Sequence, residues 1–359
     1  MNTLKKKLSY TQVLIIGSGI IGKFNALELA KLGFKVLVID PCQSTNSSNA
    51  ALGILMGKIY QKRTGRSWKL REKSIELWPK WLKEFREINP KVAFEKPLIK
   101  MTTNKDHFEK MKNFVLKYPN DNLEILNEHS NLLQNIQNIF NNKNIQGIVS
   151  YEDGRINPKI LLNTIDILLK KYKVDTIDDA VFEIKKDKES WVTLLKRGNE
   201  IISKVVIVCN SLNSLKLINS QIYNFELQPV LGQAIEISIK DNSTNFLNLP
   251  KVFSINGKNI IPLSKDKLIL GSTDEYSSTL KEEKINELIN FVEDKPQWLN
   301  IQNITKKWYG IRSKPIGEGS PLLKTLEAGL ILCTGFYKNG ILLAPACSNW
   351  VSEEVQKHI

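Results

Sequence analysis

The feature that most constrains the fold is a glycine-rich turn between two short apolar segments near the start of the chain. The run Val13-Leu14-Ile15-Ile16 is typical of a strand buried on both faces of a parallel sheet. The turn Gly17-Ser18-Gly19-Ile20-Ile21-Gly22 follows, and then a segment with helical spacing of apolar residues up to Gly33. A second apolar strand, residues 35–39, ends at Asp40. This order predicts a βαβ unit.

Each position of the turn occupied by glycine needs glycine for a physical reason. Gly17 allows the tight turn, Gly19 leaves room for a diphosphate to approach the backbone, and Gly22 lets the helix pack closely on the strand. The helix N-terminus offers N–H groups and a partial positive charge to phosphates, and Asp40 can accept hydrogen bonds from ribose hydroxyls. The pattern therefore predicts a dinucleotide site rather than a turn without a ligand. The turn alone does not separate NAD from FAD.

Buried parallel strands are expected in three separate places, with antiparallel strands between them. The apolar runs at residues 205–209 and 329–334 resemble the first two strands, whereas 231–239 and 267–271 alternate between apolar and polar residues. We therefore expect an α/β fold with a discontinuous nucleotide-binding domain and an antiparallel-sheet substrate domain. The expected ranges are 1–90, 150–225 and 305–359 for the first domain and 91–149 and 226–304 for the second.

Several local expectations can be tested against a structure. We expect residues 44–51 to form a loop, 92–148 to be irregular with short helical pieces, and 151–157 to form a turn before a helix at 158–172. Residues 280–292 are expected to be helical. The Trp-rich segment 68–88 predicts a long amphipathic helix, which we expect to be buried against a sheet rather than to lie on a membrane surface.

Composition excludes several classes of function. The net charge of +14 invites a nucleic-acid interpretation, but only seven of the 51 basic residues are Arg, and the Lys residues are spread along the chain among acidic ones. No apolar run is long enough for a membrane-spanning helix, and no secretory signal is evident, so we expect a cytoplasmic protein. The four cysteines and three histidines lack metal-ligand spacing. They predict reduced thiols and no metal.

The segment from Cys333 to Ala346 is the most specific motif outside the glycine turn. It reads Cys-Thr-Gly-Phe-Tyr-Lys-Asn-Gly-Ile-Leu-Leu-Ala-Pro-Ala. This resembles the flavin-contacting segment of the D-amino-acid-oxidase-like family of FAD-dependent oxidoreductases, most closely the glycine oxidases of thiamine biosynthesis, which read G-H-[FY]-R-N-G-I-L-L-A-P-A. Further segments resemble motifs of the same family in the same order: Ser47–Ile54, Glu152–Pro158, Pro229–Gln233, Gly271–Glu275 and Trp308–Arg312.

The resemblance implies a two-domain flavoprotein whose FAD lies in a Rossmann-like domain of the GR2 type. It implies oxidation of an amine or small amino acid of the glycine, sarcosine or D-amino-acid type. A hydride passes to the flavin, an imine forms and hydrolyses to an oxo acid, and oxygen or another acceptor takes the electrons. The cysteine of the covalently flavinylated relatives has no counterpart here, so we expect non-covalent FAD. A homo-oligomer stays open.

The resemblance also assigns residues. Arg312 matches the arginine that binds the substrate carboxylate, a task that suits a planar fork, with a structural ion pair as the alternative. Lys338 stands where the family has a second arginine, and Asn259 where glycine oxidase has a substrate-facing tyrosine; these three are the expected catalytic-site residues. The expected FAD-binding residues are Gly17, Gly19, Ile20, Ile21, Gly22, Asp40, Pro41, Ser47, Ser48, Leu52, Gly53, Ile54, Val181, Ser211, Gly335, Phe336, Tyr337, Asn339, Gly340, Ile341 and Leu342.

Other departures from the family pattern leave two alternative functions. Leu231 replaces an arginine, and Ser211 stands at a glycine near the cofactor. A flavoprotein dehydrogenase acting on a non-amine substrate, or a flavin-binding protein with weak oxidase activity, therefore competes with the amine oxidase. A pyridine-nucleotide dehydrogenase on a similar fold does not explain the segment from Lys338 to Ala346. No nucleic-acid partner and no membrane span are expected.

Overall fold

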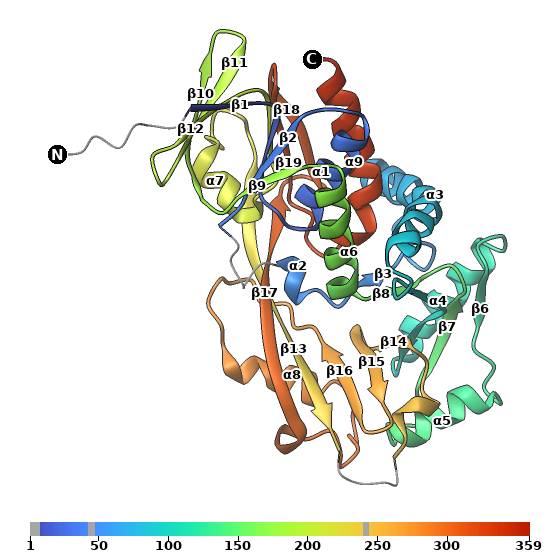
Figure 1. Ribbon diagram of the computed structural model, residues 1–359. Coiled ribbons are helices and arrows are strands. Elements are labelled where there is room, and N and C mark those ends of the chain that lie inside the picture. The colour runs from blue at the N-terminus through green and yellow to red at the C-terminus, as the bar shows by residue number, and fades with distance from the viewer. Residues whose placement is uncertain (1–7, 42–46, 240–243) are drawn as a thin grey trace.

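Two eight-stranded sheets lie one above the other in an elongated molecule (Figure 1). The computed structural model describes residues 8–41, 47–239 and 244–359. The upper sheet carries the glycine-rich turn, and the lower sheet is mostly antiparallel. A small three-stranded sheet lies between them, formed by β3 (Ile54–Leu55), β8 (Gly154–Ile156) and β4 (Phe94–Glu95). The expected mixed α/β fold is confirmed.

The upper sheet is parallel at its centre. β1 pairs in parallel with β12 and with β2, and β12 also pairs in parallel with β19. The strand order is β10-β11-β12-β1-β2-β9, with β19 joined to β12 and β18 joined to β19. The strands are β1 (Leu8–Ile16), β2 (Val36–Ile39), β9 (Asp175–Ile177), β10 (Val181–Asp187), β11 (Ser190–Leu195), β12 (Glu200–Val208), β18 (Leu322–Glu327) and β19 (Leu330–Thr334).

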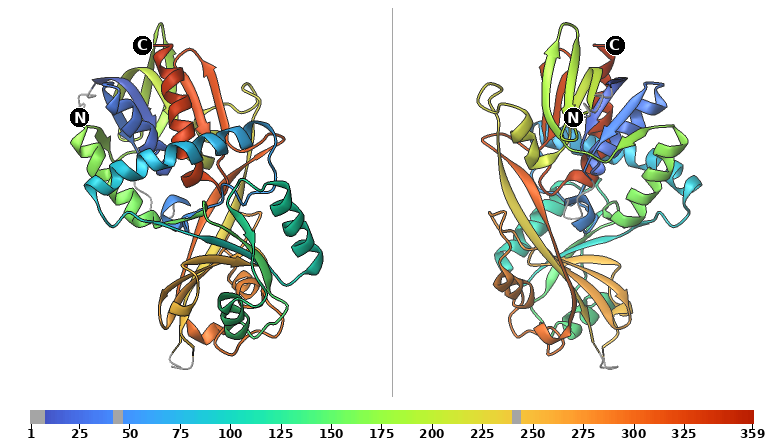
Figure 2. Two further views of the ribbon diagram at one scale, coloured as in Figure 1. Left: turned by 90° about the vertical axis from the view of Figure 1, so that its right-hand side faces the viewer. Right: turned by 60° about the vertical axis from the view of Figure 1, so that its left-hand side comes forward.

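Both faces of this sheet are covered, which is why its central strands are apolar throughout. Val13 and Ile15 of β1 face a layer of helices, whereas Leu14 and Ile16 face the side on which β10, β11 and the 211–225 segment pack. The helix layer consists of α1 (Ile20–Lys31), α3 (Gly65–Ile88), α6 (Pro158–Lys171) and α9 (Gly340–Gln356) (Figure 2).

The long helix α3 packs on other helices. Its Trp81 ring lies 4.9 Å from the ring of Phe24 in α1, and Trp78 donates from Nε1 to the carbonyl of Leu342 in α9 at 3.0 Å. The expectation that this helix packs against a sheet was therefore wrong, because α1, α6 and α9 provide its apolar partner surface. Trp78 and Trp81 are buried inside the protein and Trp68 is partly buried, so the three do not form an exposed membrane-facing stripe.

The lower sheet has the order β17-β13-β16-β15-β14-β5-β7-β6. Helices α5 (Asn131–Ile139) and α8 (Asn286–Ile289) cover one face, and α4 (Lys105–Lys117) packs on the other. The strands are β5 (Leu98–Thr102), β6 (Leu123–Ile125), β7 (Gln146–Ser150), β13 (Glu226–Ser238), β14 (Val252–Ile255), β15 (Lys258–Ser264), β16 (Lys267–Gly271) and β17 (Ile304–Ile316).

Two long strands link the lobes. β13 and β17 each span 13 residues and pair along most of their length, forming a ribbon that runs from the lower sheet toward the upper one (Figure 1). Trp308 of β17 donates from Nε1 to the carbonyl of Ala50 at 3.2 Å, which joins the ribbon to the segment after the glycine turn. The residue ranges proposed above for the two domains stay a prediction; β17, placed in the first of them, belongs to the lower sheet.

Four local expectations were wrong. Ser47–Ala50 forms a short helix, α2, within the expected 44–51 loop, whose residues 44–46 lie outside the described part. The expected 151–157 turn contains β8, and 280–292 holds only a 3₁₀ turn and the four-residue α8. Residues 92–148 contain regular strands and helices. Two polar residues in this segment are helix N-caps. Asn104 accepts a hydrogen bond from the amide of His107, and Ser130 accepts one from the amide of Leu133.

Candidate functional site

The glycine turn leaves no room for side chains. Gly17 has φ +107°, in the region that favours glycine, and a Cβ there would lie 2.8 Å from the carbonyl oxygen of Cys209. A Cβ on Gly22 would lie 1.8 Å from the carbonyl oxygen of Gly17. Gly19 is the N-cap residue of α1 and has no side chain to cap it. The backbone of the turn is therefore open to a ligand at the helix N-terminus.

Two polar side chains stand at the mouth of this turn. Asp40, at the end of β2, accepts a hydrogen bond from the amide of Ser18 at 2.6 Å. Ser48 of α2 accepts one from the amide of Ile20 at 2.9 Å, and Ser47 opens the same helix. The carboxylate expected to bind a ribose thus lies directly beside the amides expected to bind a diphosphate.

The loop at residues 52–54 is held rigidly beside α2. Gly53 has φ +83°, and a Cβ there would lie 1.9 Å from the carbonyl oxygen of Ile156. Arg155 donates from Nε to the carbonyl of Leu52 at 2.9 Å, and the amide of Ile156 donates to Gly53 at 3.0 Å. Ile54 continues into β3, which pairs with β8. The Glu152–Pro158 motif is therefore a clamp for this loop.

Asp153 is the buried centre of that clamp. Its carboxylate accepts from the amides of Gly57, Lys58 and Ile59 at 2.6, 2.9 and 2.6 Å. Burial raises the pKa of Asp153, although these backbone hydrogen bonds oppose the rise. The motif found in the sequence thus has a structural task here.

The C-terminal motif returns to the glycine turn. Gly335 and Tyr337 have φ +69° and +52°, and the amide of Tyr337 donates to the carbonyl of Ser313 at 3.0 Å. Asn339 precedes α9 and accepts from Nη2 of Arg71 at 3.1 Å. A Cβ on Gly340 would lie 3.5 Å from Cγ2 of Ile20. The N-termini of α1 and α9 therefore lie close together.

The remaining expected cofactor residues surround this junction in different ways. Ser211 has φ +58°, which explains why the family pattern has glycine there, and its Oγ lies 3.0 Å from Oγ of Ser313. Val181 packs on the apolar cluster beneath Ile39, and Pro41 is exposed directly after Asp40. Four others belong to the buried core around α1 and α9: Ile21, Phe336, Ile341 and Leu342.

Small residues form the floor of the lower sheet facing α2. The strand registers pair Asn259 with Gly271, Gly271 with Ala234, and Val230 with Arg312. Paired residues in a sheet point to the same face, so Asn259 and Arg312 lie on one face, with Gly271 and Ala234 beside Asn259 and Val230 beside Arg312. A Cβ on Gly271 would lie 3.2 Å from Cδ1 of Leu52, which shows that this face points toward the 52–54 loop.

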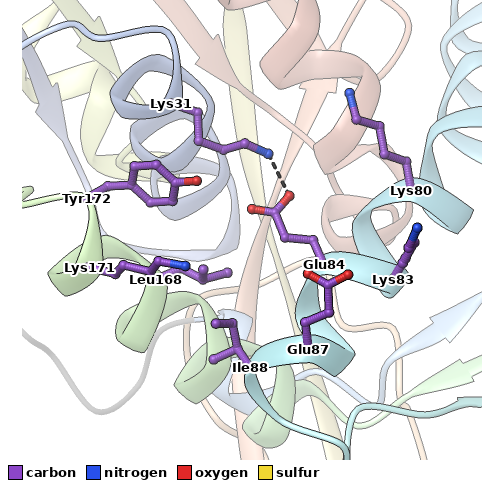
Figure 3. Close-up of a pocket in the computed structure, with 9 residues that line it drawn as sticks. All are labelled: Lys31, Lys80, Lys83, Glu84, Glu87, Ile88, Leu168, Lys171 and Tyr172. Carbon is purple, nitrogen blue, oxygen red and sulfur yellow. Dashed lines mark hydrogen bonds and ion pairs between the residues drawn. The ribbon is translucent and has the colours of Figure 1, made fainter.

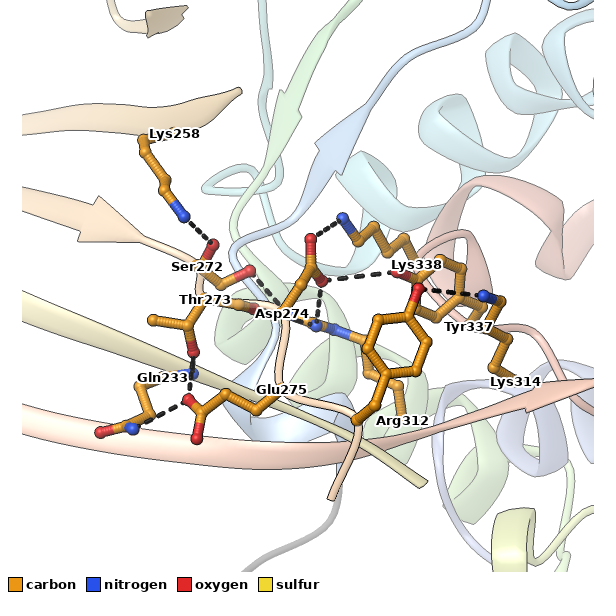
Figure 4. Close-up of polar contacts among 11 residues, drawn as sticks. Gln233, Lys258, Ser272, Thr273, Asp274, Glu275, Arg312, Lys314, Tyr337 and Lys338 are labelled. Atoms are coloured by element: carbon orange, nitrogen blue, oxygen red, sulfur yellow. Dashed lines mark hydrogen bonds and ion pairs between the residues drawn. The ribbon is translucent and has the colours of Figure 1, made fainter. Parts of the chain in front are cut away.

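The Arg312 side chain lies over the backbone of Gly232. A Cβ on Gly232 would lie 2.1 Å from Nη2 of Arg312. Its guanidinium donates from Nη1 to Asp274 Oδ1 at 3.0 Å and from Nη2 to Ser272 Oγ at 2.5 Å (Figure 4). Lys338 donates from Nζ to Asp274 Oδ2 at 2.5 Å. The structure therefore brings together two of the three expected catalytic-site residues on one carboxylate.

Asn259 is placed differently. It shares the face of Arg312, and its buried Oδ1 has no hydrogen-bond partner in the described part of the chain. A buried acceptor without a partner costs free energy, so it is a candidate ligand contact.

Burial shifts the ionisation of several groups here. Desolvation lowers the pKa of Arg312, and Asp274 opposes the shift. Desolvation also raises the pKa of the Tyr337 phenol, with the Asp274 charge acting in the same direction. Both groups keep their protons at physiological pH, so Arg312 is a permanent cation and Tyr337 a neutral donor.

Sequence reasoning missed Asp274, Lys314 and Tyr276. Lys314 donates to the hydroxyl of Tyr276 at 3.0 Å, beside the ring of Tyr337. Asp274 occupies the variable position of the Gly271–Glu275 motif, and Lys314 follows Arg312 by two residues on the same strand. The alternation of side chains along β17 was the signal that could have revealed Lys314.

A surface hollow lies away from the glycine turn. It is lined by residues of α1, α3 and α6, including Lys31 and Glu84, which form an ion pair at 2.6 Å (Figure 3). Lys31 is at the opposite end of α1 from the glycine turn, roughly 17 Å along the helix. This ion-paired surface contributes nothing to the glycine turn.

Within the described ranges, no group of three or more His, Cys, Asp or Glu residues could hold a metal ion. In the same ranges, no helix is both long and apolar enough to cross a bilayer.

The fold and the turn define a dinucleotide-binding protein with a second, antiparallel lobe. The chain belongs to the DAO family of FAD-dependent oxidoreductases, whose family model matches residues 12–354. Its cofactor is FAD. No curated protein sequence matches the chain.

Solved structures share the fold across nearly the whole length. Glycine oxidase from Bacillus cereus superposes with a TM-score of 0.81 at 21% identity, covering 97% of this chain and 95% of that one. Iminodiacetate oxidase from Chelativorans sp. BNC1 superposes with a TM-score of 0.82 at 16% identity, covering 97% of this chain and 96% of that one. L-α-glycerophosphate oxidase from Mycoplasma pneumoniae, with FAD bound, gives 0.81 at 15% identity, with 97% and 95% covered.

The described residues fit FAD. The glycine cradle without Cβ atoms, the N-terminus of α1 and the Asp40 carboxylate suit the diphosphate and ribose of the adenine half. The N-terminus of α9 lies next to that cradle and can face the flavin half.

Proposed function

We propose that this chain oxidises an amine or a small amino acid of the glycine, sarcosine or D-amino-acid type to an imine, which water converts to an oxo acid. Bound FAD supplies the oxidising power by accepting the hydride from the substrate carbon. The observation that carries the proposal is a mostly buried arginine, Arg312, above a floor of Gly232, Ala234 and Gly271, on the face that points to the FAD-binding loops.

Arg312 is the proposed anchor for a substrate carboxylate. Its side chain is 15% exposed, and its two terminal nitrogens already hold oxygen atoms of Asp274 and Ser272. The same two nitrogens can bind a carboxylate in a two-pronged arrangement. Lys338 supplies a second positive charge at the same place.

Asn259 is the proposed partner of the substrate amine. An amine must reach the flavin with the lone pair of its nitrogen available. A protein group that accepts a hydrogen bond from an N–H of the amine can orient the amine and leave that lone pair free. The buried Oδ1 of Asn259 is such an acceptor. Because Gly232, Ala234 and Gly271 carry little or no side chain, they leave room for a substrate between Asn259 and Arg312.

The finer details rest on resemblance. Similarity to glycine oxidases supports glycine or sarcosine as substrate, a role in thiamine biosynthesis, a cytoplasmic location and non-covalent FAD. Lys338, Asn259 and Leu231 differ from the glycine oxidase pattern, and they favour the second candidate, a flavoprotein that acts on a non-amine substrate.

An anaerobic titration distinguishes the two candidates. The purified holoenzyme is mixed with glycine, sarcosine, D-alanine, iminodiacetate and glycerol 3-phosphate, and the flavin absorbance is followed. Bleaching by at least one amine supports the proposal. Bleaching by glycerol 3-phosphate alone, or by none of the compounds, refutes it.

A further inference from the structure

The carboxylate of Asp274 already uses the contacts that a substrate carboxylate would use. Oδ1 accepts from Arg312 Nη1 at 3.0 Å and lies 3.4 Å from the hydroxyl of Tyr337, while Oδ2 accepts from Lys338 Nζ at 2.5 Å (Figure 4). An incoming carboxylate must therefore share these donors with Asp274 or displace it.

Displacement needs only a rotation of the Asp274 side chain. The backbone on both sides is fixed, because the amide of Thr273 donates to Gln233 at 3.1 Å and the amide of Glu275 donates to Leu231 at 2.9 Å. The Asp274 side chain itself is 38% exposed, so its carboxylate can turn to water. The chain thus carries a tethered competitor for its own anion site.

A ligand with a single carboxylate gains little from this exchange. The ligand carboxylate takes the place of the Asp274 carboxylate on Arg312 and Lys338. The electrostatic attraction between the ligand and these two cations is offset by the loss of the attraction between Asp274 and the same cations. Selective binding therefore needs a further contact that Asp274 does not already make.

Lys314 offers that contact. It lies two residues after Arg312 on β17, so both side chains are on the same face. Its ammonium donates to Tyr276 at 3.0 Å, and no carboxylate in the described part of the chain lies within ion-pair distance of it. The Nζ atoms of Lys314 and Lys338 lie 5.5 and 5.3 Å from the centroid of the Tyr337 ring. Two cations therefore hold Asp274, and a third, Lys314, lies beside the same tyrosine ring as Lys338.

We propose that the substrate of this site is an amine carrying two separate carboxylates. One carboxylate replaces Asp274 on Arg312 and Lys338, and the other binds Lys314. Asp274 then lowers the affinity for every carboxylate ligand, and Lys314 is the specificity-determining residue that favours two carboxylates over one. This inference rests on the proposed amine-oxidising function and names its substrate class.

Calorimetric titration of the holoenzyme with anions that cannot be oxidised tests this inference. The probes are acetate, malonate and inorganic phosphate. We expect malonate to bind about two- to fivefold more tightly than acetate, because it gains one partly exposed ion pair. Equal affinities for acetate and malonate would overturn the proposal. Phosphate binding more tightly than malonate would also overturn it, because two separate acidic groups would then not be needed.

Two variants identify the residues responsible. Asp274→Asn should tighten acetate and malonate binding by a similar factor, because neither ligand then has to displace a carboxylate, whereas Lys314→Gln should weaken malonate and leave acetate unchanged. The matched controls are Asp187→Asn, on an exposed hairpin, and Lys307→Gln, exposed on the same strand as Lys314. Weaker acetate binding by Asp274→Asn would contradict the competition, and no effect of Lys314→Gln would contradict the second contact.

These results are separable from the function itself. If no amine bleaches the flavin but malonate still binds preferentially, the amine-oxidising function fails while the dianion site stands. If glycine and sarcosine bleach the flavin and the anions show no preference, the function stands and the substrate class proposed here fails.

Discussion

Replacing Gly22 with alanine tests the most constrained contact in the molecule. The added methyl group would lie 1.8 Å from the carbonyl oxygen of Gly17, and that oxygen belongs to the backbone and cannot rotate away. Helix α1 and the turn must therefore separate by about 1 Å or more, and overpacking of this kind costs about 1–3 kcal/mol of folding free energy. The separation also moves the N–H groups of α1 away from the diphosphate. A loss of about 2–4 kcal/mol in binding corresponds to a roughly 30- to 1,000-fold weaker Kd for FAD.

The assay is titration of the apoprotein with FAD, followed by quenching of flavin fluorescence, together with a thermal melt of each variant. Gly319→Ala is the matched control, because its methyl group would meet only the movable hydroxyl of Ser67 at 3.2 Å. We expect normal FAD affinity for the control and severely weakened affinity for Gly22→Ala. If Gly22→Ala binds FAD as the unaltered protein does, with an unchanged melting temperature, the close approach of α1 to the turn is refuted.

Three other predictions follow from the same structure. Arg312→Ala should raise the KM for amines with a carboxylate by about 100-fold, since charge-assisted bonds to the fork are lost, and Arg312→Lys should give an intermediate value; unchanged steady-state KM values would exclude the anchoring role. Asp153→Ala should lower the free energy of unfolding in urea by about 3 kcal/mol, because it leaves three amides without an acceptor, and a loss under 1 kcal/mol would contradict the clamp. Burial raises the pKa of the Cys209 and Cys347 thiols, so iodoacetamide at pH 8 should label them only after unfolding, as peptide mapping by mass spectrometry would show. Because their folded pKa values lie above the unfolded ones, their contribution to stability should be present below about pH 8.5 and be lost as the pH rises.

The upper lobe could be predicted from the sequence because its signals are local. The strand, the turn and the helix from Val13 to Lys31 are neighbours in the chain, and each glycine reports a nearby steric demand. The wrong local expectations have an equally local cause. Short polar segments such as Ser47–Ala50 carry little apolar periodicity, and contacts with Trp308 and the glycine turn support their structure instead.

The anion site could be predicted only in part. Arg312 and Lys338 were found through family motifs, whereas their meeting on Asp274 depends on the register between β13 and β16 and between β13 and β17. That register is set by pairings across many residues, and a single sequence does not reveal it. The floor formed by Gly232, Ala234 and Gly271 was missed for the same reason.

The absorption spectrum of the purified protein shows directly whether the glycine turn binds FAD. We expect a yellow protein with flavin bands, and acid denaturation should release close to one FAD per chain into the supernatant, as expected for non-covalent binding. A colourless protein that takes up no FAD when the cofactor is added would contradict the cradle at Gly17–Gly22 and every step built on it.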